Sequence, residues 1–176
     1  MKIQIIAQIF GIFGLIFNVL SYQMKENKKV ALVQGIGGLL FFINYAMIGA
    51  VAGALLNIAT LMRGILFAKN TKKVWKLVVV EGFIIGSTGY AVVMNMGDGL
   101  QIALSMLIGI AILGVSFFMW YGDGKKLRYF QSFVSSPAWM IHNIFNFTLG
   151  GIICEALNML SVTVSFIRFG KKGFSP

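Results

Sequence analysis

Ionisable and amide side chains are scarce in this chain of 176 residues, and several of them lie inside long apolar runs. His142 and Glu155 are the first to consider, because an imidazole and a carboxylate together can hydrogen-bond a polar solute or bind a proton. They lie about six residues before and after a turn expected near residues 148–149. In an antiparallel hairpin this spacing puts both at the same depth, ~9 Å from the turn.

Asn44 and Asn57 are placed in the same way about a turn expected at Gly49 and Ala50. A polar group within an apolar span is costly, which makes it a functional candidate by default. The candidate substrate-binding residues are therefore Asn44, Asn57, Trp139, His142, Asn143 and Glu155. The alternative is that these amides and their partners only hydrogen-bond one helix to another, at ~0.6 kcal/mol each.

Arg63 and Glu81 are two further charged residues that fall inside apolar runs. Arg63 lies near the basic end of its run, so its long side chain is expected to extend to the headgroups. For Glu81 two alternatives stay open. It forms an ion pair with Lys76 or Arg63 at the membrane edge, or it takes part in transport.

These residues lie in an unusually apolar chain. It contains 58% hydrophobic and 11% charged residues, whereas soluble domains average about 45–50% and about 25%. The polar breaks are separated by ~17–22 mostly apolar residues, close to the ~20 that cross a bilayer as a helix. The chain is therefore predicted to be an all-α integral membrane protein, surrounded by lipid.

The apolar runs predict seven transmembrane helices. Gly49-Ala50 and Gly150-Gly151 divide two runs that are too long for single spans. The expected helices cover residues 3–23, 30–48, 51–68, 74–95, 101–121, 129–148 and 151–169.

Basic residues cluster after the first, third, fifth and seventh expected helices, whereas the other connections carry no such cluster and include Asp98. By the positive-inside rule, this asymmetry predicts an inner (plasma) membrane protein with its N-terminus outside and its C-terminus in the cytoplasm. The same rule accounts for the net charge of +10, so no nucleic-acid partner is expected.

An internal repeat emerges when the sequence is shifted against itself by 98 positions, because the breaks between apolar runs then coincide. His142 falls on Asn44, and Glu155 falls on Asn57. The prediction is a three-helix repeat in residues 1–73, a linker helix in 74–98 and a second three-helix repeat in 99–176. Because four spans separate equivalent positions, the two repeats are parallel in the membrane.

This 3+1+3 plan resembles the SWEET, PQ-loop and PnuC-type transporter group. More locally, the runs Trp139-Met140-Ile141-His142-Asn143 and Gly150-Gly151-Ile152-Ile153-Cys154-Glu155 resemble the YgjV family of small bacterial inner-membrane proteins. No activity is settled for that family, so the resemblance implies none for this chain. The chain also lacks the Pro-Gln pair of PQ-loop proteins, and Pro137 is its one proline within an expected helix.

A transporter of a small polar metabolite (a sugar, vitamin, nucleoside or amino acid) is the function that these features favour. A structural or assembly protein without transport activity is the alternative. Catalysis is not expected, because no paired aspartates or Ser/His pair is present. One cysteine and one histidine suggest neither a metal site nor a cofactor. The sequence leaves the oligomeric state open, a homo-oligomer included.

Overall fold

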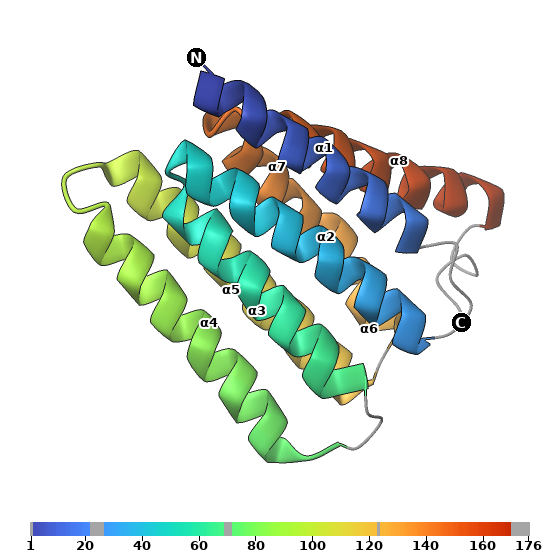
Figure 1. Ribbon diagram of the computed structural model, residues 1–176. Coiled ribbons are helices and arrows are strands. Elements are labelled where there is room, and N and C mark those ends of the chain that lie inside the picture. The colour runs from blue at the N-terminus through green and yellow to red at the C-terminus, as the bar shows by residue number, and fades with distance from the viewer. Residues whose placement is uncertain (1, 22–26, 69–71, 123, 170–176) are drawn as a thin grey trace.

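All regular structure that the computed structural model describes is helical (Figure 1). The described residues are 2–21, 27–68, 72–122 and 124–169. Their elements are α1 (Lys2–Ser21), α2 (Asn27–Ile48), α3 (Val51–Ala68), α4 (Val74–Met94), α5 (Gly99–Tyr121), α6 (Gly124–Phe130), the π-helix η1 (Gln131–Ser135), α7 (Ser136–Phe145) and α8 (Leu149–Phe169). Because α6, η1 and α7 are continuous, the described residues make seven helical passes, which confirms the all-α prediction and the count of seven.

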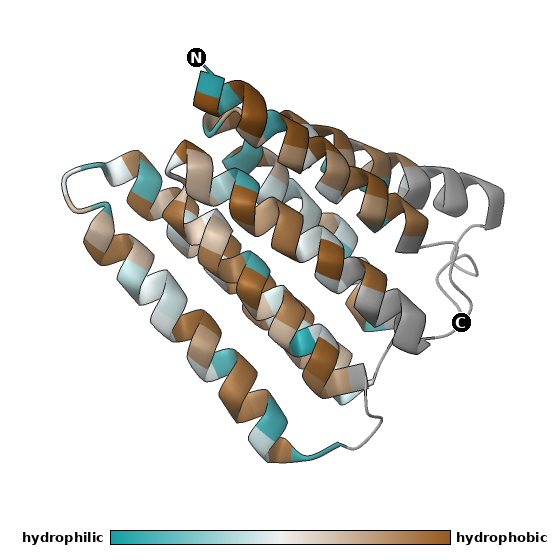
Figure 2. Ribbon diagram, in the orientation of Figure 1, coloured by the Kyte–Doolittle hydropathy of each residue, from teal (hydrophilic) through white to brown (hydrophobic). Residues whose placement is uncertain are grey.

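Within the described part of the chain, three helices are long and apolar enough to cross a membrane along one uninterrupted stretch, namely residues Lys2–Leu20, Val74–Met94 and Gly99–Tyr121. Shorter apolar helices cover Gly35–Ile48, Val51–Phe67 and Leu149–Leu160. Apolar residues dominate most helices, and polar residues gather near several helix ends (Figure 2). The main departure from the expected boundaries is the sixth pass, which spans 124–145 instead of 129–148.

Six of the seven passes form a closed ring. In order around it, α1 packs on α2, α2 on α3, α3 on α5, α5 on α7, α7 on α8 and α8 on α1. We call this arrangement the six-helix ring. Helix α4 packs on α3 and α5 from outside and forms one edge of the molecule (Figure 1). Its outward side chains are apolar, with Val78 62% exposed, as expected of a surface that faces lipid.

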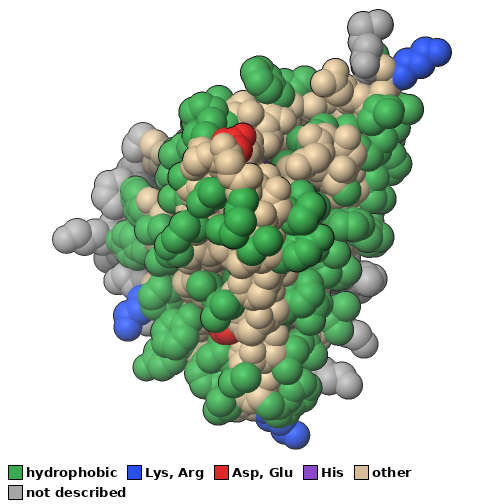
Figure 3. Space-filling view, turned by 90° about the vertical axis from the view of Figure 1, so that its left-hand side faces the viewer, with side chains coloured by type: hydrophobic (Ala, Val, Ile, Leu, Met, Phe, Trp, Pro, Cys, Tyr) green, Lys and Arg blue, Asp and Glu red, His purple; other side chains and the backbone are tan. Residues whose placement is uncertain are grey.

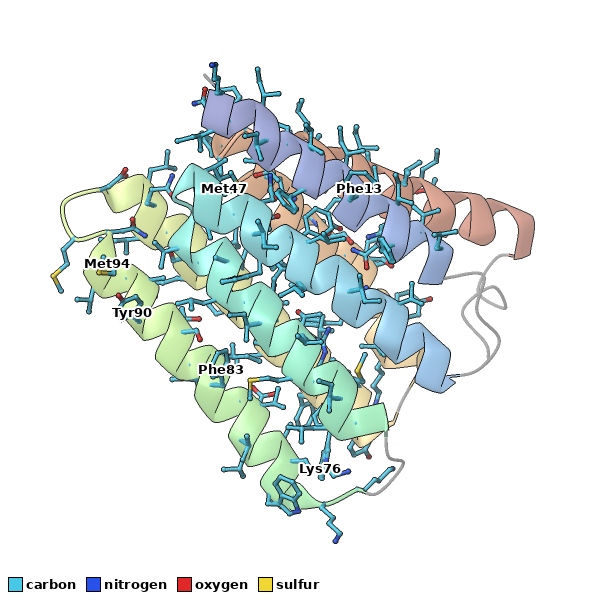
Figure 4. All side chains as sticks on the ribbon, viewed as in Figure 1. Phe13, Met47, Lys76, Phe83, Tyr90 and Met94 are labelled. Atoms are coloured by element: carbon cyan, nitrogen blue, oxygen red, sulfur yellow. The ribbon has the colours of Figure 1, made fainter. Side chains whose placement is uncertain are left out.

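Apolar side chains cover most of the face shown in Figure 3, and the Lys and Arg side chains lie at its edges. At one end of the bundle the loop before α4 meets the end of α5: Lys72 Nζ donates to the carbonyl of Tyr121 at 2.9 Å. Lys126 Nζ lies over the aromatic ring of Tyr121, 5.9 Å from the ring centroid. Lys76 lies near this end of α4, and Met94 lies at the opposite end (Figure 4). Two basic connections therefore meet at one end of the bundle.

The two short hairpin turns have the same backbone path. Gly49 and Phe147 both adopt positive φ, at 80° and 51°. This left-handed conformation is common for glycine and rare for phenylalanine. In each turn the following amide bonds back into the preceding helix, from Ala50 to Tyr45 at 2.9 Å and from Thr148 to Asn143 at 3.0 Å.

Glycines allow α1 and α8 to approach closely. A Cβ on Gly150 would lie 2.3 Å from the carbonyl carbon and oxygen of Gly11. Because both of those atoms belong to the backbone, a side chain at Gly150 requires the two helices to separate. The ring is closed at this point by small residues.

The π-helix η1 ends just before Pro137. Proline has no N–H to donate to the carbonyl four residues earlier, that of Phe133, so the regular α-helical pattern cannot continue there. Such π segments occur mostly inside α-helices and are frequent at functional sites. Here the segment brings Ser135 and Ser136 to the interior, where both are buried.

Candidate functional site: a polar cavity inside the helix ring

A cavity of about 130 Å³ lies inside the six-helix ring, lined by side chains from all six passes. Its amide side chains are Asn18, Asn57, Gln131, Asn143 and Asn158. Two charged residues, Arg63 and Glu155, and three aromatic ones, Phe41, Tyr45 and Trp139, also line it. None of its lining comes from α4. The cavity is far more polar than the outer surface of the bundle, so it can hydrogen-bond a solute.

Four of the six residues predicted to bind substrate line this cavity: Asn57, Trp139, Asn143 and Glu155. Asn44 and His142 are not among its lining residues. Asn44 is fully buried, and its Nδ2 donates to the carbonyl of Ala7 at 2.7 Å. That bond joins α2 to α1, the packing role that the sequence left open for these amides.

His142 is 1% exposed and lies beside the cavity rather than in it. Its ring packs edge-on against Tyr45 and Trp139, with centroids 5.6 Å away in both cases. The cavity-lining positions of α7 are Ser136, Trp139 and Asn143. At 100° per residue, His142 is rotated away from that face, toward Gly53 of α3. Glu155 therefore lines the cavity, whereas His142 is buried beside it.

Tyr45 and Asn143 line the cavity toward the hairpin ends of their helices. The Tyr45 hydroxyl donates to Asn143 Oδ1 at 2.5 Å, joining α2 to α7. Tyr45 is 2% exposed, and its ring lies 5.9 Å from that of Trp139. Toward the other end of the bundle the cavity reaches the exposed side chain of Gln131. The lining is thus buried at Tyr45 and Asn143 and exposed at Gln131.

Glu155 lies on α8, about 9 Å along the helix from its first residue, Leu149. Its Oε2 accepts a hydrogen bond from Asn158 Nδ2 at 3.3 Å. Ser136, at the junction of η1 and α7, also hydrogen-bonds to it. These neutral donors hold a half-buried carboxylate toward the cavity, with no positive charge among them.

Arg63 departs most from its expected position. It is 8% exposed, lines the cavity and donates from Nη1 to Ser116 Oγ on α5 at 3.3 Å. The expectation that its side chain extends to the headgroups is therefore wrong. Arg63 and Glu81 of α4 attract each other electrostatically. A residue near the end of a span can turn inward when the ring offers a polar interior and a nearby carboxylate.

Several cavity residues were not among the predicted set, and some had a signal in the sequence. Shifting Asn143 by 98 positions gives Tyr45, so the repeat itself points to that residue. Asn18 and Asn158 are amides within spans. Ser135 and Ser136 had no such signal, because their inward position depends on the π-helix. Among the described residues, no three His, Cys, Asp or Glu side chains are grouped as metal ligands would be.

Seven helical passes with long apolar stretches and a polar interior define a multi-pass membrane protein. The chain matches the family model Imp-YgjV, described as bacterial inner membrane protein, over residues 5–173. It therefore belongs to that family, which confirms both the local resemblance and the inner-membrane location. No curated protein and no solved structure matches the chain.

Proposed function

We propose that this protein is a membrane transporter that moves a small polar metabolite by alternating access. The observation that carries the proposal is the cavity of about 130 Å³ inside the six-helix ring, lined by amides, charges and aromatic rings. For comparison, an engineered cavity of ~150 Å³ holds one benzene molecule. The substrate that fits this conformation is therefore small.

The proposed mechanism uses two parallel three-helix repeats, in residues 1–73 and 99–176, joined by a linker helix in 74–98. The packing pattern supports them: α1 on α2 corresponds to α5 on α7, α2 on α3 to α7 on α8, and α3 on α5 to α8 on α1. The matched hairpin turns support them too, since Gly49 and Phe147 are 98 positions apart. The position of α4 outside the ring suits a linker.

Tyr45 and Asn143 are themselves 98 positions apart and hydrogen-bonded. Equivalent residues can touch only near the axis that relates the two repeats. Their bond therefore lies where a rocking motion of one repeat against the other would open or close the path. This is the SWEET-like arrangement, in which a substrate path lies between repeats near the midplane.

The proposed orientation follows the basic connections, with the N-terminus outside and the C-terminus in the cytoplasm. Tyr45 and Asn143 then close the outer side, and the cavity extends toward the cytoplasm. The partners that we propose are membrane lipids and a small-molecule substrate, without a cofactor, a nucleic acid or an enzymatic reaction. A structural or assembly protein without transport activity is the competing proposal.

Uptake into proteoliposomes tests the proposed function. We expect at least one solute in a radiolabelled panel of sugars, vitamins, nucleosides and amino acids to enter faster than into protein-free liposomes. The unlabelled solute should compete, because a binding site saturates. If no member of the panel enters above the protein-free rate, with the protein shown to be folded, the structural alternative is favoured.

A further inference from the structure

The two charged residues of the cavity lie on opposite walls. Arg63 is on α3 and Glu155 is on α8, which are separated in the six-helix ring by two passes on either side. Measured from the hairpin ends of their helices, Arg63 lies about 18 Å deep and Glu155 about 9 Å deep. The cavity is therefore lined by one anionic and one cationic residue, whose Cα atoms are offset by about 9 Å along the helix direction.

Each of the two charges has its own partners among the described residues. Glu155 accepts hydrogen bonds from neutral groups, Asn158 and Ser136. Arg63 uses one of its five N–H donors on Ser116, and its electrostatic partner Glu81 is not part of the cavity lining. A carboxylate that accepts only neutral donors gains further from a cation, and a guanidinium can hold a carboxylate with two parallel hydrogen bonds.

We propose that the substrate is a small zwitterion, which binds with its ammonium group at Glu155 and its carboxylate at Arg63. This inference rests on the proposed function and narrows its substrate class. An uncharged sugar would leave Glu155 without a counter-ion and would leave Arg63 with Glu81 alone. A simple amine or a simple carboxylate would engage only one of the two charged residues. The ring of Trp139 also lines the cavity, as does Glu155, and adds attraction for a cation.

A matched series of four-carbon solutes tests this on the purified full-length protein. The series is 2-aminobutanoate, 4-aminobutanoate, butylamine, butanoate and butanol, with Kd measured by calorimetry and ligand-induced thermal stabilisation. We expect one of the two zwitterions to bind at least ~10-fold more tightly than the amine, the acid and the alcohol. Equal binding of the amine or the acid would overturn the proposal, as would failure of both zwitterions to bind.

Two variants test which cavity residue binds which charged group of the substrate. In Glu155→Gln the preferred zwitterion should bind no better than butanoate, and in Arg63→Gln it should bind no better than butylamine. Lys73→Gln, which removes an exposed charge outside the cavity, should leave the Kd unchanged. If Arg63→Gln does not fold, Arg63→Lys keeps the positive charge but loses the two-bond geometry, and its Kd for the zwitterion should rise. Unchanged affinity in both cavity variants contradicts the assignment.

The proposed substrate class and the proposed transport function can be contradicted separately. Tight zwitterion binding without uptake into proteoliposomes would support the substrate class and contradict the transporter proposal. Saturable uptake of a sugar or another uncharged solute, with no zwitterion binding, would support the transporter and overturn the substrate class.

Discussion

Replacing Gly150 with leucine should lower the melting midpoint of the protein, the largest stability effect that we expect from a single substitution. Even a Cβ at this position would lie 2.3 Å from the backbone carbonyl of Gly11, so α1 and α8 would have to separate. Overpacking typically costs ~1–3 kcal/mol and sometimes more. A loss of ~3 kcal/mol would lower the midpoint of thermal unfolding by about 6–12 °C. Fluorescence-detected size exclusion after heating measures this directly.

Gly82→Leu is the matched control, because Gly82 lies on the outer helix α4, where a Cβ would have no atom within 4 Å. That variant should have the melting midpoint of the wild type. If Gly150→Leu also keeps that midpoint, the close contact between α1 and α8 is wrong, and the six-helix ring is not closed in the way described.

Replacing Thr60 with tryptophan should reduce uptake to the protein-free rate while leaving a folded protein. Thr60 lines the cavity from α3 and is half-buried, with its hydroxyl bonded to its own helix, at the carbonyl of Leu56. A cavity of about 130 Å³ is close to the volume that one benzene-sized ring occupies. An indole in this position therefore competes with any substrate for the same space.

Val78→Trp is the control for this variant. It places the same side chain on the exposed face of α4, where lipid accommodates it. Uptake of the solute identified in the panel should match the wild type in Val78→Trp. If Thr60→Trp transports as fast as Val78→Trp, the cavity is not the substrate path.

Apolar length and turn residues predicted the fold class well. The number of passes could be predicted because each apolar run of membrane-spanning length must satisfy its backbone internally as a helix. The turn at Gly49 was visible because glycine readily takes positive φ, as it does there. The turn at Phe147 has the same backbone with no glycine, so its residue type gave no such signal.

Side-chain direction limited the prediction of the site. Depth along a helix follows from residue number, and it led to Asn57 and Glu155, which both line the cavity. Depth does not specify the direction in which a side chain points around the helix axis. For that reason Asn143 lines the cavity, whereas its neighbour His142 lies beside it. Arg63 was misplaced for a related reason, because its inward direction depends on Ser116 and Glu81 of neighbouring helices.

The accessibility of Cys154 tests alternating access most directly. It is the one cysteine of the chain, so the wild-type protein serves as the reporter. Its side chain lines the cavity and is 6% exposed. It lies farther from the hairpin turns than the hydrogen bond between Tyr45 and Asn143 does. A small, positively charged methanethiosulfonate that cannot cross the membrane is added to inside-out or right-side-out vesicles, with Cys154→Ser as the blank.

We expect Cys154 to react from both sides of the membrane, faster from the cytoplasmic side, because in the proposed orientation the bonded residues Tyr45 and Asn143 lie toward the outside. Tyr45→Phe, which removes the hydroxyl that bonds to Asn143, should raise the rate from the outside. A carrier must expose its cavity to each side in turn. Reaction from a single side in both proteins, or from neither side, would contradict alternating access.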